Sequence, residues 1–369
     1  MFGYRVIQLS LGKQARYALL LALTAGLSGQ ATADSSDREG LETPGFEFAL
    51  IGDVPYTAAQ KDKVNVLIQE MNRERLAFVV HDGDFKSGST LCDDATFNDR
   101  LQIFQTLAHP FVYVAGDNDW TDCHRASNGG YDPLERLAKL REIFFAGDHS
   151  LGRRTLKLTR QSDVPRYALY RENLRWVYGD VVFVGLNVPG SNNNLGRTPA
   201  MDAEYRDRNA ANLAWMKEAF DFARQQEAKG IMLVIQANPG FELAPSNSDR
   251  TGYNDFLAAL QSETSAFGRP VVLVHGDSHY FRIDKPMVDA VSQTRVDNFT
   301  RVETFGSPDV QWVRVKVDVS DANVFVFEQG RPTKTNRSGR PRTQPRDRYG
   351  GHRPPRAHRA DSMAGGYLL

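Results

Sequence analysis

Six short apolar runs, each rich in Val, Ile, Leu or Phe and each closed by polar residues, constrain the fold of this 369-residue chain most strongly. Runs of this length and composition are typical of strands that are buried on both faces. Segments with helical periodicity separate them. The predicted strands are 46–51, 76–80, 111–114, 181–186, 231–235 and 271–274, and the predicted helices are 58–71, 95–107, 133–144, 201–226 and 253–267.

The alternation of strand and helix predicts an α/β layered domain. Toward the end of the chain the pattern changes to strand after strand, at 310–319 and 323–328. Two stacked sheets with helices on their outer faces accommodate both patterns. We therefore expect one layered domain over residues 34–330.

The first 33 residues have the pattern of an export signal. Three basic side chains precede the apolar run 17–27, and Ala31-Thr32-Ala33 provides a small-residue cleavage pattern before Asp34. The apolar run has about half the length that a membrane-spanning helix needs, so an uncleaved anchor is the weaker interpretation. The pattern predicts a mature, soluble protein that is periplasmic or secreted.

The chain contains two cysteines, Cys92 and Cys123. In the cytosol such a pair would most often be two unrelated thiols. In an oxidising compartment each is the only possible disulfide partner for the other. The export signal therefore predicts a Cys92–Cys123 disulfide. In the chain-entropy model, closing this loop stabilises the fold by about 3–4 kcal/mol.

Charge is distributed unevenly although the formal net charge is +0. Setting aside three basic side chains in residues 1–33, and ten basic and two acidic ones in residues 331–369, leaves 32 basic and 43 acidic side chains, a net charge of −11. This acidic body argues against specific nucleic-acid recognition. Residues 331–369 are rich in Arg and Pro, so we expect a disordered basic tail, either a solvated extension or a tether to an anionic surface.

Polar side chains follow five of the predicted strands, and four of these five strand ends contain Gly-Asp. One Gly-Asp is an ordinary turn dipeptide, but ligands of α/β sheets gather at the carboxyl ends of strands. Four such pairs therefore predict a carboxylate cluster, which a hard divalent cation would stabilise. The five segments are 52–56 (Gly-Asp-Val-Pro-Tyr), 81–88 (His-Asp-Gly-Asp-Phe-Lys-Ser-Gly), 116–120 (Gly-Asp-Asn-Asp-Trp), 236–240 (Gln-Ala-Asn-Pro-Gly) and 275–279 (His-Gly-Asp-Ser-His).

The order of these segments resembles the calcineurin-like metallophosphoesterase superfamily over about residues 46–330. The resemblance implies a four-layer α/β/β/α sandwich that hydrolyses a phosphomonoester or phosphodiester with metal-activated water. It assigns Asp53 as the first metal ligand and Asp84 as the aspartate shared between two metal ions. Asp117 and Asp277 stand where the superfamily has asparagine and histidine ligands, and His279 matches the last histidine ligand.

The sequence also departs from the superfamily pattern. Pro55 replaces a histidine ligand, and segment 236–240 contains no histidine. Asn118 stands where the superfamily has the histidine that acts on the leaving group. Because oxygen replaces nitrogen at several positions, Mn or Mg is as well suited as Zn or Fe, with one or two ions bound.

Three further residues are candidates for roles near the phosphate. His124 follows Cys123 and is expected to supply the missing acid, although a solvent-facing loop histidine has the same pattern. Lys86 and Asn238 are expected to contact a phosphorylated small-molecule substrate, and Lys86 is equally consistent with a surface lysine. His81 and His275 precede their Gly-Asp pairs and are expected to be core histidines.

Two other functions are compatible with this sequence. The missing histidines favour a catalytically degenerate, exported protein of the same fold that binds a metal or ligand. A surface adhesin that acts through the basic tail would leave the carboxylate cluster unexplained. The sequence does not distinguish among nucleotides, phospholipid head groups, phosphoproteins and phosphosugars as substrates.

Overall fold

The structure is a computed structural model of the whole chain that describes residues 45–289 and 291–330. The predicted export signal 1–33 and the predicted tail 331–369 lie outside these residues, so both remain predictions. Within the described part of the chain, no helix combines the length and the apolar character needed to cross a membrane.

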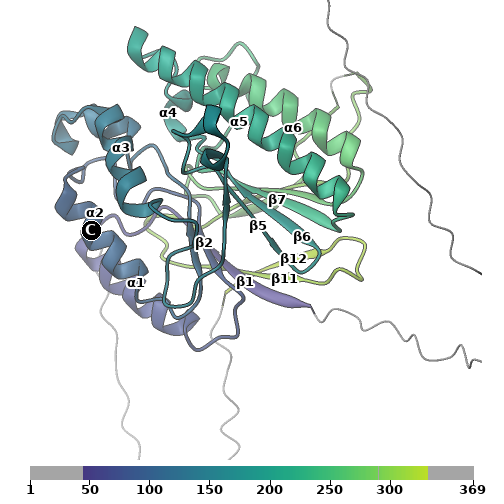
Figure 1. Cartoon of the computed structure of the whole chain (residues 1–369), viewed down its shortest axis with the longest axis horizontal. Helices are drawn as coiled ribbons and strands as arrows, with labels where there is room; N and C mark the ends of the chain where they lie inside the picture. The colour runs from purple at the N-terminus through teal and green to yellow at the C-terminus, as the bar shows by residue number, and fades with distance from the viewer. Residues whose placement is uncertain (1–44, 290, 331–369) are drawn as a thin grey trace, which may run out of the picture. The chain divides into compact units, whose positions relative to one another are not determined.

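Two mixed β-sheets form the body of the protein (Figure 1). One sheet has the order β12-β11-β1-β2-β3, and the other has the order β4-β5-β6-β7-β8-β10-β9. The first contains β1 (Phe46–Ile51), β2 (Val79–His81), β3 (Phe111–Tyr113), β11 (Val313–Val317) and β12 (Phe325–Gln329). The second contains β4 (Thr159–Arg160), β5 (Leu174–Tyr178), β6 (Val181–Gly185), β7 (Gly230–Val234), β8 (Val271–His275), β9 (Arg282–Asp284) and β10 (Phe299–Glu303).

The central strands of each sheet are parallel. β1, β2 and β3 run in one direction in the first sheet, and β6, β7, β8 and β10 do so in the second. Parallel neighbours end at the same edge of their sheet, so the loops that follow them are brought together. This geometry places the polar segments of the sequence at shared edges.

Five long helices cover the outer faces of the sheets (Figure 1). Four of them begin at a Ser/Thr/Asp-type cap, because the side chains of Thr57, Asp93, Asp132 and Thr198 each accept a backbone N–H from the first turn. The helices over the first sheet are α1 (Ala58–Met71), α2 (Asp94–Phe104) and α3 (Pro133–Phe144); those over the second are α5 (Pro199–Gln225) and α6 (Asn254–Phe267). Short helical turns are α4 (Gly190–Asn193), η1 (Thr121–His124), η2 (Ala126–Asn128), η3 (Gln161–Asp163), η4 (Pro165–Tyr167) and η5 (Thr251–Tyr253).

Alternate residues of β6 belong to two different hydrophobic layers. Phe183 packs between the sheets, with its ring centroid 5.4 Å from that of Phe48 and 5.1 Å from that of Phe78. Val182 and Val184 belong to the other cluster, which includes side chains of α5 and α6. The period of two is that of a strand buried on both faces, and it confirms the predicted sandwich of two sheets between helices.

The predicted bounds are correct for β1, α1 and α3, and they differ by a few residues elsewhere. β2 begins at Val79 rather than Leu76. β5 was not predicted, because Arg175 interrupts its apolar pattern. In the structure Arg175 is 8% exposed, and its guanidinium lies over the rings of Trp215 and Phe222. Cation–π packing therefore lets an arginine occupy a buried strand position.

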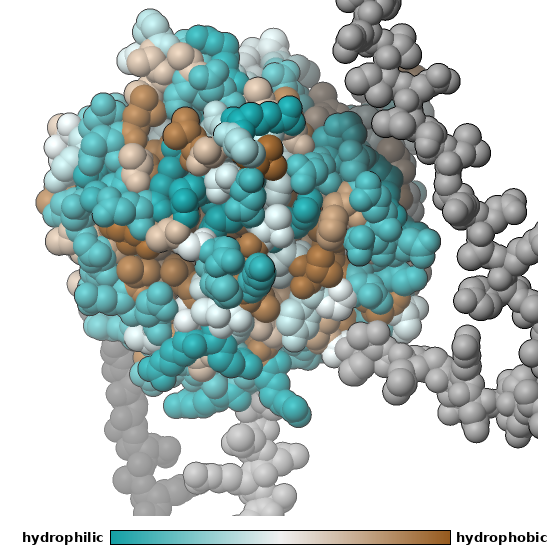
Figure 2. Space-filling model, viewed as in Figure 1, coloured by the Kyte–Doolittle hydropathy of each residue, from teal (hydrophilic) through white to brown (hydrophobic). Residues whose placement is uncertain are grey.

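The surface seen in Figure 2 alternates between hydrophilic and apolar residues, with the apolar ones in separate spots. Several large apolar side chains of the described residues are exposed singly, such as Leu169 at 70% and Val291 at 94%. Scattered exposed apolar residues are normal for a folded domain.

Cys92 and Cys123 form the predicted disulfide, with their Cα atoms 5.7 Å apart. The bond joins the loop after β2 to η1, and both sulfur atoms are buried. Two segments that carry candidate site residues are thereby linked covalently.

We expect the double variant Cys92→Ala/Cys123→Ala to lose about 3–4 kcal/mol of unfolding free energy, because the loop between the cysteines is no longer closed in the unfolded chain. Urea unfolding followed by circular dichroism measures this difference. Wild-type protein treated with a reductant is the control and should lose a similar amount. A variant as stable as the oxidised wild type would contradict the expectation.

Candidate functional site

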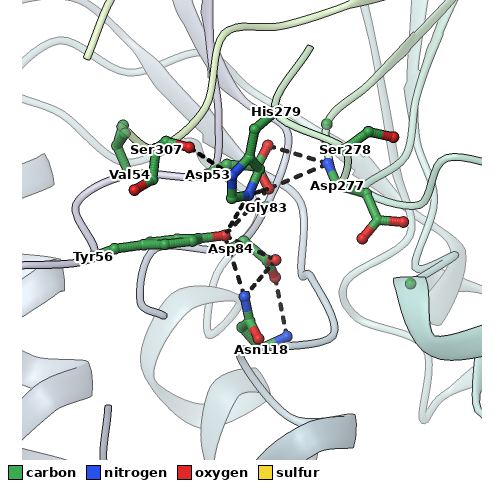
Figure 3. A network of polar contacts seen from close by, with 12 residues as sticks. Asp53, Val54, Tyr56, Gly83, Asp84, Asn118, Asp277, Ser278, His279 and Ser307 are labelled. Atoms are coloured by element: carbon green, nitrogen blue, oxygen red, sulfur yellow. Dashed lines mark hydrogen bonds and ion pairs between the residues drawn. The ribbon is translucent and has the colours of Figure 1, made fainter. Parts of the chain in front are cut away.

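Five loops come together at the carboxyl edges of the two sheets. They follow β1, β2, β3, β7 and β8, the five strands whose ends carry the polar segments. Figure 3 labels residues of the loops after β1, β2, β3 and β8. Four of the predicted ligands adopt left-handed backbone conformations: Asp53 (φ 51°), Asp84 (φ 58°), Asp277 (φ 76°) and His279 (φ 61°). Left-handed geometry is costly for residues other than glycine and clusters at functional sites.

The hydroxyl of Tyr56 lies at the centre of one half of the site. Its oxygen is 3.3 Å from Asp53 Oδ1, 3.2 Å from Asp84 Oδ2 and 3.1 Å from His279 Nε2. Asn118 Nδ2 donates to the same hydroxyl at 3.2 Å and to Asp84 Oδ2 at 2.7 Å. Figure 3 shows these groups directed toward one point. The structure therefore brings together four predicted site residues around a tyrosine that the sequence analysis did not select.

The other half of the site contains Asp117, Asp277 and the side-chain amide of Gln236. A Cβ atom added to Gly190 would lie 2.8 Å from Asp117 Cγ and 2.8 Å from Asp277 Oδ1, so the two carboxyl groups flank one point. Gln236 Nε2 donates to Asp84 Oδ2 at 3.2 Å, and the amide also hydrogen-bonds Asp277. Gln236 Oε1 accepts from the backbone N–H of Asp117.

The carboxylate of Asp119 joins the loop after β2 to the loop after β3. Its carboxylate accepts the backbone N–H groups of Asp84 at 2.9 Å, Phe85 at 3.0 Å and Gly116 at 2.8 Å, together with the hydroxyl of Tyr113 at 2.6 Å. Charge-assisted bonds of this kind are stronger than neutral ones. Asp119 therefore fixes the position of Asp84 through its backbone N–H group.

Burial and mutual repulsion raise the pKa values of the site carboxyls. Burial is the main cause for Asp84, whose pKa lies well above its ordinary value, and repulsion from Asp117 adds to it. Burial, followed by repulsion from Asp122, raises the pKa of Asp117 to about 6. Burial and Asp117 likewise raise the pKa of Asp277, which borders a cavity and is only partly buried. Burial therefore disfavours the charged forms of these carboxyl groups more than their hydrogen-bond donors favour them.

Two basic side chains, His279 and Lys86, lie among these carboxyl groups. Burial opposes the charged form of His279, but the ion pair with Asp53 outweighs it, so the pKa of His279 is raised. Lys86 is fully buried and donates to the backbone carbonyl of Ser87 at 3.2 Å. Burial lowers the pKa of Lys86, while the carboxylates of Asp119 and Asp84 favour its charged form. The alternative of a surface lysine is wrong, because Lys86 is fully buried, and its predicted phosphate contact stays a prediction.

The donor set matches a hard divalent cation in chemistry, because carboxylate oxygens outnumber the single imidazole. In geometry, the described residues contain no group of three or more His, Cys, Asp or Glu side chains placed to hold a metal ion. The hydroxyl of Tyr56 and the amide of Gln236 stand between the carboxyl groups. As the side chains lie, they do not fit a resident two-metal centre, and Tyr56 would have to move before Asp53 and Asp84 could share an ion.

The remaining candidates lie at the periphery of the site. His124 is exposed, and its Nδ1 is 2.8 Å from the carbonyl oxygen of Thr121. Asn238 donates its backbone N–H to Asp277 Oδ2 at 3.0 Å and its side chain to Ser278 Oγ at 2.7 Å. Asn238 and Asp277 line a cavity of about 500 Å³. The predicted roles of His124 and Asn238 stay predictions.

His81 and His275 are both fully buried, in accordance with the expected core positions. Burial lowers the pKa of His81 to about 4 and that of His275 to about 3, so both are neutral at pH 7. His81 Nε2 is 3.1 Å from the carbonyl of Val54, and its Nδ1 accepts the N–H of Gly83. His81 thereby ties the loop after β1 to the loop after β2.

The sequence analysis missed three residues that organise the site: Tyr56, Gln236 and Asp119. Each lies inside one of the five polar segments, so position alone could have selected them. Tyr56 has the strongest signal, because it lies three residues after Asp53 in the first polar segment. Its inward direction depends on contacts with residues far away in the sequence, which only the tertiary structure provides.

No protein-family model matches the sequence, and no curated protein matches it. Solved structures that are similar include a dimetal phosphatase from Danio rerio, with 13% identity, 78% of this chain and 96% of that chain covered, and a TM-score of 0.47. PhoD is 14% identical to this chain. The match covers 76% of this chain and 65% of PhoD, with a TM-score of 0.49. A purple acid phosphatase from yellow lupin is 10% identical. The match covers 78% of this chain and 53% of that phosphatase, with a TM-score of 0.44.

The strand order of the chain itself defines the class of fold. Two mixed sheets lie between helices, and their parallel strands end at a shared carboxylate-rich edge. This is the layered α/β/β/α sandwich that the sequence analysis predicted. The fold by itself does not assign an activity to this chain.

Asp117 provides a pH-dependent test of the buried charge. Its folded pKa of about 6 exceeds the ordinary value of 3.8, so its contribution to stability is complete below pH 3.8 and is lost as pH rises through 6. Above pH 6 the ionised carboxylate costs on the order of 3 kcal/mol. We expect Asp117→Asn to stabilise the metal-free protein by about 1–3 kcal/mol at pH 8 and by less at pH 4.5, measured by urea unfolding with a chelator. An equal effect at both pH values would contradict this.

Tyr56 can be tested against Tyr280, whose side chain is 66% exposed. Tyr56→Phe removes the hydroxyl that contacts Asp53 and Asp84, so the metal-free protein should lose about 1–3 kcal/mol of unfolding free energy. The same change should increase the affinity for Mn²⁺ in calorimetric titrations, because the point between the carboxylates becomes vacant. Tyr280→Phe should change neither quantity. Unchanged stability and Mn²⁺ affinity in Tyr56→Phe would refute the central role of this hydroxyl.

Proposed function

We propose that this protein is an exported phosphoesterase that acts on a phosphorylated small molecule and depends on a hard divalent cation. The observation that carries the proposal is the gathering of buried carboxyl groups with raised pKa values at the joined strand ends. A fold gains no stability from such a cluster, so its presence supports a chemical role. The disulfide is in keeping with export into an oxidising compartment.

A divalent cation such as Mg or Mn, once bound, would act as a Lewis acid toward a phosphoryl oxygen and lower the pKa of a coordinated water. Asp53, Asp84 and His279 are the residues that could hold it after Tyr56 moves, with Asp117 and Asp277 on the other side. These side chains are carried by loops that short hydrogen bonds already fix. The proposal therefore requires the side chains of Tyr56 and Gln236 to move, because both stand between the carboxyl groups.

Other residues of the chain would bind and orient the substrate. The amide of Asn118 donates toward Asp84 and Tyr56, and the same N–H group could donate to a phosphoryl oxygen. Asn118 carries no titrating proton, so the proposal assigns the leaving-group proton to another acid, with His124 as the candidate near the rim. The cavity of about 500 Å³ beside Asp277 is the space proposed for the rest of the substrate.

A second candidate function is a catalytically degenerate protein that binds phosphorylated ligands without hydrolysing them. Tyr56 and Gln236 favour this alternative, because neutral hydrogen-bond donors stand between the carboxyl groups. If these donors remained in place permanently, the site would need no cation for stability. The two functions differ in metal uptake and in turnover, so one experiment separates them.

Asp84→Asn is the decisive variant. The side chain keeps its size and loses its charge, so we expect the fold to survive, Mn²⁺ binding to weaken strongly, and hydrolysis of p-nitrophenyl phosphate to fall by at least about 100-fold. Calorimetry, metal analysis of the purified protein and steady-state rates with added Mg²⁺, Mn²⁺ or Zn²⁺ measure these effects.

The matched control is Asp62→Asn, an exposed aspartate on α1. This variant should bind metal and hydrolyse the ester like the wild type. Wild-type metal content and activity in Asp84→Asn would refute the proposal. A wild-type protein that binds phosphate but takes up no metal and hydrolyses no ester would establish the degenerate alternative.

A further inference from the structure

A pair of arginines shares one buried carboxylate at the edge of the site. Asp122 is 1% exposed, and its Oδ2 lies 2.6 Å from Arg125 Nη2. Arg197 pairs with Oδ1 of the same carboxylate. Two guanidinium groups against one carboxylate leave a net positive charge beside a centre that is otherwise negative. We call Asp122, Arg125 and Arg197 the arginine edge.

The arginine edge is held rigidly. Arg125 lies between η1 and η2, and its carbonyl accepts the backbone N–H groups of Asn128 at 2.9 Å and Gly130 at 3.0 Å. The side chain of Asn128 donates to the carbonyl of Asp122 at 3.0 Å. The disulfide at Cys123 fixes the same turn to the loop after β2. A preorganised turn of this kind loses little entropy when a ligand binds.

Two connections link the arginine edge to the carboxylate centre. Ser191 Oγ lies 2.7 Å from Asp117 Oδ2 and 3.1 Å from Asp122 Oδ1, so its single O–H can donate to either carboxyl group. On the other side, a Cβ atom added to Gly88 would lie 2.8 Å from Asn118 Oδ1 and 3.0 Å from Arg125 Nη1. Arg125 Nη1 and the amide oxygen of Asn118 therefore both pack against Gly88, which places the guanidinium beside the side chain that contacts Asp84.

The exposure of the two arginines differs. Arg125 is 45% exposed, whereas Arg197 is 20% exposed and also donates to the carbonyl of Thr121. Among the contacts of the described residues, Arg125 Nη2 pairs with Asp122, and Nη1 lies against Gly88 beside the amide oxygen of Asn118. Arg125 thus presents part of its guanidinium fork to a ligand, while Arg197 balances the charge of Asp122.

We propose that Arg125 binds non-bridging phosphoryl oxygens of the substrate and makes the site selective for phosphomonoester dianions over phosphodiester monoanions. This inference rests on the proposed function and names its substrate class. A guanidinium fork matches phosphoryl oxygens in geometry and charge. A phosphomonoester presents three non-bridging oxygens to the guanidinium and a diester presents two, and the attraction to the guanidinium is larger for the dianion.

The test compares Arg125→Gln and Arg125→Lys with the wild type on p-nitrophenyl phosphate and bis(p-nitrophenyl) phosphate. We expect Arg125→Gln to raise KM for the monoester about tenfold or more, to change kcat little, and to raise KM for the diester less. Arg125→Lys keeps the charge without the fork and should be intermediate. The control is Arg295→Gln, an exposed arginine paired with Asp297, which should leave both KM values unchanged.

Calorimetric titration with inorganic phosphate and with dimethyl phosphate separates this inference from the proposed function. If the wild type hydrolyses neither ester but binds phosphate more tightly than dimethyl phosphate, and Arg125→Gln loses that preference, the arginine edge is supported and the hydrolytic function fails. If Arg125→Gln leaves phosphate affinity and the monoester KM unchanged, the arginine edge is refuted whether or not the wild type is an enzyme. A wild type with no affinity for phosphate refutes it as well.

Discussion

Buried negative charge is the constraint on which the rest of this structure depends. Removing a carboxylate from water is costly unless donors, a proton or a cation replace the lost hydration. Here backbone N–H groups supply much of the replacement: three of them point at Asp119, and the N–H of Asp277 faces both oxygens of Asp53 at 3.2 Å. The loops adopt left-handed conformations at Asp53, Asp84 and Asp277 to present these groups. Backbone strain and buried charge therefore occur at the same residues.

The two-sheet architecture is what allows so much charge to gather in one place. The parallel strands of each sheet end at a shared edge, and the aromatic layer around Phe183, Phe48 and Phe78 stacks one sheet on the other. Loops separated by more than 200 residues, after β1 and after β8, are thereby brought into hydrogen-bonding contact. The apolar layer and the charged edge are two parts of one arrangement, because the first fixes the position of the second.

Hydrogen-bond donors of the chain stand where the carboxyl groups converge. The hydroxyl of Tyr56 contacts both Asp53 and Asp84, and the amide of Gln236 contacts Asp84 and Asp277. Neutral donors stabilise carboxylates without neutralising them, which is consistent with the raised pKa values that remain. This arrangement is compatible with both proposed functions. In the phosphoesterase a cation would replace these donors, and in the degenerate protein the donors would stay in place. The arginine edge places two guanidinium groups around Asp122, beside this centre, and in either case it would favour an anion.

Periodicity and segment order were sufficient to predict the layered fold, most helix and strand positions, the disulfide pair and the five polar segments at strand ends. The helices, strands and polar segments depend on residues that are neighbours in the sequence, and the two cysteines have one possible pairing. These features can therefore be predicted without the tertiary structure. The inward direction of Tyr56, the positioning role of Asp119 and the meeting of Gln236 with Asp84 depend on side chains from different loops. Only the tertiary structure decided them, because a hydrogen bond forms between atoms that are close in space, whatever their separation along the chain.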